Sequence, residues 1–95
     1  MQLAKVVGTV VSTRKESSLD GLKFLMVRPV DEEGRETGSI LVAADAVGAG
    51  PEEIVLIASG SSARQTQMTD KRPVDAVVMG IVDTWNVGNA TKYKK

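Results

Sequence analysis

The residues that could carry out acid–base or nucleophilic chemistry are carboxylates, lysines, hydroxyls and one tyrosine, because the sequence contains no histidine and no cysteine. Asp75 and Asp83 fall on one predicted strand, where eight residues at strand rise separate them by about 26 Å, too far for a carboxylate pair. Asp45 precedes a glycine-rich bend, and we expect it to cap a turn or to bond across an interface. The catalytic alternative is that Asp45 of one chain acts together with Asp75 or Asp83 of another chain. Ser61 and Ser62 lack a histidine to activate them. We therefore predict no enzyme activity, no cofactor and no metal site.

The glycine-rich segment 48–50 does not predict a phosphate-binding loop. It lacks the further glycine and the lysine of that motif. Glu52 and Glu53 follow almost at once, and their negative charges would repel a phosphate.

A length of 95 residues predicts one domain with a modest core. The absence of cysteine removes disulfide frameworks and fits a cytoplasmic protein. Residues 1–5 lack the basic start and long apolar core of a secretion signal, and no apolar run approaches the ~20 residues that a membrane span needs. We expect a soluble, unprocessed chain.

Short apolar runs punctuated by glycine predict strands, because β-branched residues dominate them. Gly8 within the first run suggests a bend, as at the corner of a small closed barrel. Ser61 is the candidate N-cap of a short helix over one barrel end. Residues 1–88 are thus expected to form a mainly β, five-stranded OB-like barrel with one short helix, followed by a polar, lysine-rich, frayed tail at 89–95. The predicted strands span residues 3–13, 22–30, 39–44, 53–59 and 74–87.

An OB-like barrel makes a binding module for single-stranded nucleic acid or a small ligand the main alternative. Such modules stack bases on aromatic side chains in a basic groove, whereas Phe24, Trp85 and Tyr93 are scattered along this sequence. The 12 basic and 12 acidic residues give zero formal charge, so no general attraction to nucleic acid or to an anionic membrane is expected. Solvated charge is the better interpretation of a local basic patch, whose members would be Arg64, Lys71, Arg72, Lys92, Lys94 and Lys95.

Two predicted strands are apolar on both faces, although a small barrel needs apolar residues on its inner face alone. In the first strand, Val7 and Val11 oppose the face formed by residues 4, 6, 8 and 10. In the last strand, Val77 and Met79 oppose residues 78 and 82. The chain has too little spare sequence to cover both second faces, so we expect contact between identical subunits.

Five segments, which together span nearly the whole chain, carry a resemblance to a known family. The first two are Met-x-Leu-Ala-x-Val-x-Gly-x-Val-Val at the start and the run 22–27 after Asp20-Gly21. The others are Asp45-Ala-Val-Gly-Ala-Gly, Val55-Leu-Ile-Ala-Ser-Gly-Ser-Ser-Ala-Arg and Val74-Asp-Ala-Val-Val-Met-Gly-Ile-Val-Asp. The combination of Gly60-Ser-Ser-Ala-Arg with Val74-Asp-Ala is the most specific. In this order, the five segments resemble the EutN/CcmL family, whose members are pentameric vertex proteins of bacterial microcompartment and carboxysome shells.

The resemblance implies a cyclic homopentamer that closes the vertices of an icosahedral shell within the cytoplasm. Its partners would be hexameric shell proteins, with enclosed enzymes as further contacts. It implies a narrow axial opening, near which we place Gly60, Ser61, Ser62 and Ala63, whose small side chains suit the approach of five identical loops. The work of such a protein is to supply fivefold curvature, with no turnover.

The subunit interface of such a ring would use the apolar residues left outside the barrel. These candidates are Val7, Val11, Val77 and Met79. Charged groups beside apolar strands set register and partner choice, so Asp45, Arg64 and Asp83 are the candidates for polar contacts between subunits.

The sequence departs from the family at Glu52, where the family tends to have a third glycine after Gly48 and Gly50. A type I turn needs no positive φ at its second corner. We therefore expect a type I turn at Pro51 and Glu52.

Overall fold

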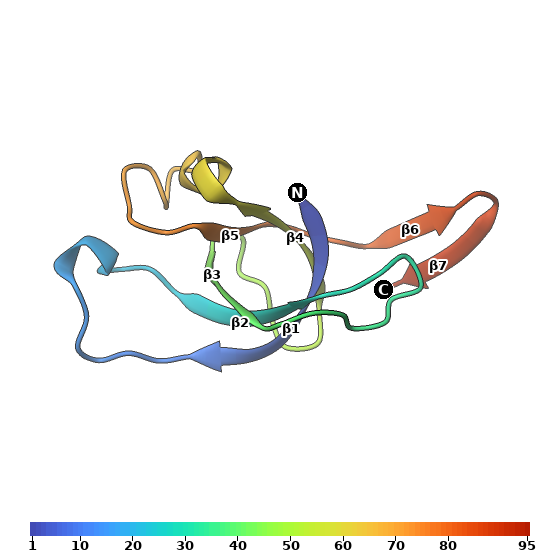
Figure 1. Ribbon diagram of the computed structural model, residues 1–95, viewed down its shortest axis with the longest axis horizontal. Helices are drawn as coiled ribbons and strands as arrows, with labels where there is room; N and C mark the ends of the chain where they lie inside the picture. The colour runs from blue at the N-terminus through green and yellow to red at the C-terminus, as the bar shows by residue number, and fades with distance from the viewer.

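The centre of the molecule is a closed barrel of five strands in the order β1-β2-β3-β5-β4 (Figure 1). The computed structural model describes the whole chain, residues 1–95. Neighbouring strands are antiparallel, except that β3 and β5 are parallel. The predicted mainly β, five-stranded barrel is confirmed. The strands are β1 Gln2–Val10, β2 Phe24–Pro29, β3 Leu41–Asp45, β4 Ile54–Ser59 and β5 Ala76–Ile81.

The predicted short helix is a 3-10 turn, η2, which spans Gly60–Arg64 directly after β4. A second 3-10 turn, η1, spans Ser17–Leu19 in the β1–β2 connection. The prediction that Ser61 caps the helix is wrong, because Gly60 reverses the chain at a φ of 64° and the turn has already begun. Ser59 occupies the capping position and makes no side-chain capping bond. Neither turn approaches the length or apolar character of a helix that crosses a membrane.

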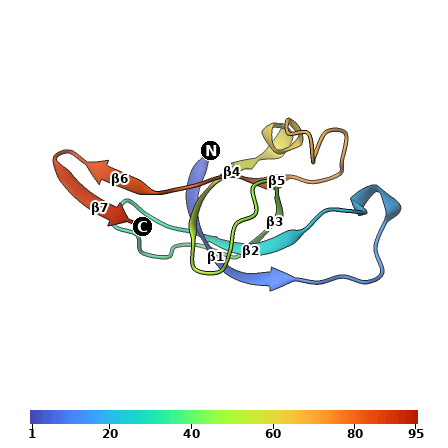
Figure 2. The same ribbon diagram turned by 180° about the vertical axis from the view of Figure 1, so that it is seen from behind.

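The last residues form a hairpin that projects away from the barrel (Figures 1 and 2). Its strands, β6 (Thr84–Val87) and β7 (Ala90–Lys94), make a separate two-stranded sheet. We call residues 84–95 the C-terminal arm. The expectation of a frayed tail is therefore wrong, and the predicted strand 74–87 is in fact two strands. The predicted limit between residues 88 and 89 lies in the turn of this hairpin, where Gly88 takes a φ of 60°.

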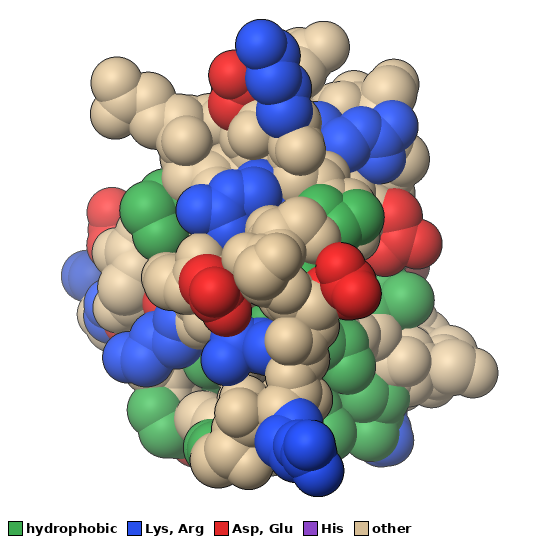
Figure 3. Space-filling model, turned by 90° about the vertical axis from the view of Figure 1, so that its left-hand side faces the viewer, with side chains coloured by type: hydrophobic (Ala, Val, Ile, Leu, Met, Phe, Trp, Pro, Cys, Tyr) green, Lys and Arg blue, Asp and Glu red, His purple; other side chains and the backbone are tan.

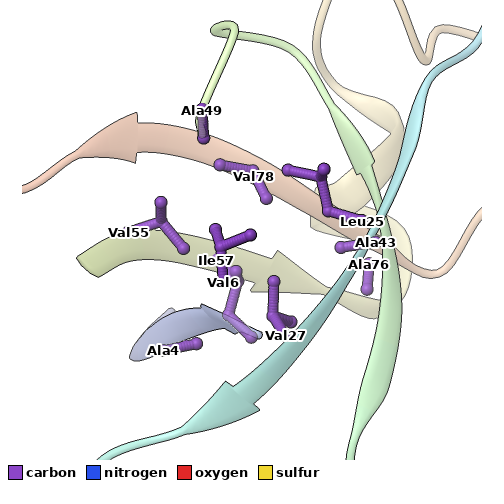
Figure 4. Close-up of a cluster of buried hydrophobic side chains, with 10 residues drawn as sticks. All are labelled: Ala4, Val6, Leu25, Val27, Ala43, Ala49, Val55, Ile57, Ala76 and Val78. Carbon is purple, nitrogen blue, oxygen red and sulfur yellow. The ribbon is translucent and has the colours of Figure 1, made fainter. Parts of the chain in front are cut away.

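Ten buried residues, all aliphatic, fill the inside of the barrel, and we call them the barrel core (Figure 4). Alternate residues of each strand point inward, such as Val55 and Ile57 of β4, both fully buried. The hydrophobic effect of burying these side chains is the main force that closes the barrel. The barrel core consists of Ala4, Val6, Leu25, Val27, Ala43, Ala49, Val55, Ile57, Ala76 and Val78.

A β-bulge at Val7 changes which residues of β1 face inward. The pairing with β2 shifts between Val6 and Gly8. Gly8 then lies on the same face as Met26, since a Cβ built on Gly8 would approach Met26 Cε to 2.8 Å. The predicted face of residues 4, 6, 8 and 10 is thus wrong in its second half, because the extra residue of a bulge reverses the alternation.

A second, smaller core lies outside the barrel beneath η2 and the neighbouring loops. It is formed by the outward side chains of β3, β4 and β5 at one barrel end, and partly buried Leu19, Leu22 and Phe24 pack against it. The sequence predicted that an identical subunit covers the outward apolar residues of the last strand. In the structure, connecting loops of the same chain cover part of them. The members of this second core are Ala44, Ala58, Ala63, Val74 and Val77.

The turn at Pro51 and Glu52 differs from the predicted type I turn. The N–H of Glu53 donates to the carbonyl of Gly50 at 3.3 Å, and Glu52 has a φ of 70°. Proline at the first corner and positive φ at the second define a type II turn, where glycine is strongly preferred. Glu52 therefore sits in a backbone conformation that suits the glycine the family tends to have there.

We expect Glu52→Gly to raise the free energy of unfolding by about 1 kcal/mol, because it removes the strain of a left-handed non-glycine residue. The gain is reduced by the greater freedom of glycine in the unfolded chain. Urea denaturation measures the change. Glu52→Gln is the matched control, since it removes the Lys5–Glu52 ion pair of 3.0 Å and leaves the backbone strain. If the glycine variant were no more stable than the glutamine variant, the claim that the backbone of Glu52 is strained would be contradicted.

Candidate assembly surfaces

A first apolar surface, which we call the β4 patch, lies on the outer wall of the barrel. It is formed by Leu3, Leu56 and Met79, from β1, β4 and β5. Leu56 pairs with Leu3 on one side and with Gly80 on the other. Leu56 and Met79 remain 36% and 37% exposed. Gly80 has no side chain, and Leu56 lies across it, since a Cβ built on Gly80 would be 3.7 Å from Leu56 Cδ1.

A second apolar surface, the β3 patch, is formed by Gly8, Met26 and Val42. Val42 is 51% exposed and pairs directly with Met26, which in turn pairs with Gly8. Strand β3 neighbours β2 and β5 in the barrel, whereas β4 neighbours β5 and β1. The two patches therefore lie on different walls. Head-to-tail association into a ring needs two different surfaces on each subunit, and these patches provide them.

The segment predicted to approach an axial opening forms most of η2. Gly60, Ser61 and Ser62 are exposed, whereas Ala63 is fully buried in the second core. The N–H of Gly60 donates to the carbonyl of Asp75 at 2.8 Å, which ties the start of η2 to the residue before β5. The structure thus presents three small, uncharged residues at one end of the barrel.

The polar residues predicted to contact a neighbour occupy very different settings. Asp45 is 5% exposed, and its Oδ1 accepts the N–H groups of Val47 and Gly48 at 3.1 and 3.0 Å. Arg64 Nη1 donates to the carbonyl of Val74 at 3.0 Å. Asp83 is exposed and makes no ion pair within the subunit. Asp45 is therefore satisfied by its own bend, while Asp83 keeps an exposed carboxylate.

The apolar residues predicted for the interface also differ in exposure and in location. Val7 is half-buried at the bulge, Val11 is 85% exposed just beyond β1, and Val77 is fully buried in the second core. Met79 alone lies in the β4 patch. Sequence reasoning missed Leu56, because it lies in the unbroken apolar run 54–58, which does not show which residues face outward. It also missed Leu3, Met26 and Val42.

Charge is mixed over the surface. The barrel end that carries η1 and η2 shows basic, acidic and apolar side chains interspersed (Figure 3). On the wall near β1, Lys5 pairs with Glu52, and the hydrogen bond with this carboxylate raises the lysine pKa. No group of three or more carboxylates gathers where it could hold a metal ion.

The three aromatic residues do not share one face. Phe24 packs against the second core at one barrel end. Trp85 and Tyr93 stack on each other in the C-terminal arm, with ring centroids 4.9 Å apart. Their stacked faces cover one another.

The family model described as "Ethanolamine utilisation protein EutN/carboxysome" matches residues 1–83. The carboxysome shell vertex protein CcmL of Synechococcus elongatus is 55% identical over 95 residues, which are 100% of this chain and 96% of that protein. The solved structure of Gloeobacter violaceus CcmL superposes with a TM-score of 0.95 at 53% identity, covering 100% of this chain and 98% of that chain. A pentameric microcompartment shell protein, GrpN from Rhodospirillum rubrum, has a TM-score of 0.84 at 49% identity, covering 92% and 99%.

The family model spans all five barrel strands, and the superposition on Gloeobacter violaceus CcmL covers the whole chain, the C-terminal arm included. These findings confirm the resemblance noted in the sequence. The chain belongs to the EutN/CcmL family.

Proposed function

We propose that this chain is a structural protein whose homopentamers cap the vertices of a bacterial microcompartment shell. The observation that carries the proposal is the likeness over the full chain to proteins named as shell vertex proteins. The pentamer itself is supported by the likeness to the pentameric protein GrpN. No turnover is involved: a sheet of hexamers is flat, and fivefold units supply the curvature that closes it.

In the proposed ring, the β4 patch of one subunit packs on the β3 patch of the next. Burial of apolar side chains from both walls drives the association. Leu56 and Met79 are proposed to lie within this contact, and Val7, Val11, Arg64 and Asp83 near its edges. The buried residues Asp45 and Val77 support this surface from within their own subunit. Asp45 holds the bend after β3, and Val77 packs beneath η2.

Such a ring has an outer rim and two faces, and we propose one partner for the rim and another for the face turned into the shell. The rim would contact hexameric shell proteins, and the inner face would contact enclosed enzymes. Both partners follow from the family's place in the shell.

Native mass spectrometry of the intact protein tests the proposal directly. Subunits of 10.1 kDa give a pentamer of about 50 kDa. A species twice that mass would be a pair of rings and would also support the proposal. A stable monomer or dimer at micromolar concentration would overturn it.

The small residues of η2 are proposed to surround the fivefold axis. The chain has no cysteine, so a single introduced cysteine reports on this position without background. We expect Ser62→Cys to form a disulfide between subunits under mild oxidation, because five copies of η2 would bring these side chains together. A ring of five with one cysteine each can form two pairs and leaves one chain free. Non-reducing gels would then show dimers and monomers, with monomers never below about one-fifth of the chains.

The control for this cross-link is Thr91→Cys, which places an exposed cysteine in the C-terminal arm, far from η2. This variant is expected to stay monomeric on the same gels. Cross-linking of both variants to the same extent would show that the disulfides form by random collision. It would contradict the proposal that η2 surrounds the fivefold axis.

A further inference from the structure

The C-terminal arm is joined to the barrel at one point and pairs only with itself. Strand pairing with the barrel ends where the N–H of Val82 donates to the carbonyl of Ile54 at 2.8 Å. From Asp83 onward the backbone hydrogen bonds stay within the hairpin, whose base is closed by the N–H of Lys95 donating to the carbonyl of Asp83 at 2.8 Å. The two-stranded sheet of the arm is separate from the barrel sheet. The arm can therefore move as one unit without breaking a barrel strand.

The arm rests against the β2–β3 loop, residues 31–38, through a single aromatic anchor (Figures 1 and 2). The indole Nε1–H of Trp85 donates to the carbonyl of Glu32 at 2.9 Å. The indole ring lies close to Gly34, since a Cβ built there would be 3.7 Å from Trp85 Cη2. One face of the indole is covered by Tyr93, which stacks on it. This anchor uses one hydrogen bond and a small area of apolar contact.

The other contacts of the arm with the rest of the subunit are ion pairs. The arm carries three lysines and no acidic residue, whereas the β2–β3 loop carries four acidic residues and one arginine. Lys92 pairs with Glu33 at 3.1 Å, and Lys95 pairs with Glu53 at the start of β4. Contact with Lys95 is the main reason that the pKa of Glu53 lies below its ordinary value. These side chains are between 21% and 46% exposed, so dissolved salt reaches them.

We propose that the C-terminal arm is a salt-sensitive latch, which opens about residue 83 and separates from the β2–β3 loop while the barrel stays folded. Opening frees the carboxylate of Glu33 and the carbonyl of Glu32 from the arm, and it uncovers the part of the Trp85 ring that lies against Gly34. Ionic strength thereby sets how often these groups are free of the arm. The contacts that define the latch, those of Trp85, Lys92 and Lys95, are made within one subunit.

The indole proton of Trp85 reports on opening, because Trp85 is the only tryptophan and its N–H is bonded across the latch. We would measure its exchange with D2O by NMR on the intact protein, relative to a free tryptophan peptide. Raising sodium chloride from about 0.05 M to about 0.5 M shortens the Debye length about threefold. Exchange in wild type is expected to be about two- to fivefold faster at the higher salt, since the rate follows the population of the open state. The amide of Ile57 in the barrel should not change.

Two variants of β7 separate the latch from a general effect of charge. Lys92→Gln removes the pair with Glu33, and Lys94→Gln removes an exposed lysine that makes no ion pair. At low salt, Lys92→Gln is expected to exchange about two- to fivefold faster than wild type and to respond less to salt, whereas Lys94→Gln behaves as wild type. A near-ultraviolet circular dichroism signal from the Trp85–Tyr93 stack shows that the hairpin itself remains folded. Equal indole exchange in all three proteins and at both salts would overturn the latch, as would indole exchange that occurs only together with exchange of the Ile57 amide.

Discussion

Leu56→Asp is expected to convert the proposed ring into monomers of 10.1 kDa under conditions where wild type has a mass near 50 kDa. Leu56 stands at the middle of the β4 patch, between Leu3 and Gly80, and it is 36% exposed in the isolated subunit. Association would bury an aspartate against the β3 patch of the neighbour with no partner for its charge. An unpaired charge in such a setting costs several kcal/mol at each contact, and a ring of five repeats that cost at every interface. Native mass spectrometry at equal protein concentration measures the loss.

Val87→Asp is the matched control for this variant. Val87 is a comparable exposed apolar residue, at 43%, but it lies in the C-terminal arm and outside both patches. The ring should survive this substitution. If Leu56→Asp also kept the mass of a pentamer, the β4 patch would not be an interface, although the family assignment would be untouched. Far-ultraviolet circular dichroism should show that both variants keep the barrel.

Ile57→Ala is expected to lower the free energy of unfolding by about 2–5 kcal/mol. Ile57 is fully buried and contributes one of the largest side chains of the barrel core. Its truncation leaves a cavity that β-strands, fixed by their ladders on both sides, cannot collapse to fill. For a domain of this size, each kcal/mol lost corresponds to a fall in melting temperature of about 4–8 °C. Urea denaturation followed by circular dichroism measures the change.

Ile40→Ala provides the same chemical change at a site that is 42% exposed. We expect it to change stability by less than about 0.5 kcal/mol. Both proteins must be compared at one protein concentration, because association adds to the apparent stability. Equal losses in the two variants would show that the barrel core does not close the fold in the way described.

The sequence alone predicted the barrel, because its evidence is local. Runs of valine and isoleucine between glycine turns indicate strands, and the order of the five family-like segments covers the chain from Met1 to Asp83. The 3-10 turn after β4 was also predictable, since Gly60 followed by small polar residues ends a strand sharply. The position of Leu56 in an unbroken apolar run hid its exposure, because a run without alternation does not show which residues face outward.

Tertiary structure alone decided the points that depend on pairing between distant segments. The bulge at Val7 reverses the faces of β1, and only the register with β2 reveals it. Val77 is covered by loops that are distant in sequence, so its burial could not be deduced from β5 itself. Glu52 accepts a positive φ because the barrel fixes both ends of its turn. The polar tail becomes an ordered arm because Trp85 meets Tyr93 and the carbonyl of Glu32. A local pattern determines which segments are strands, whereas register, covering loops and anchors depend on contacts that form only when the whole chain folds.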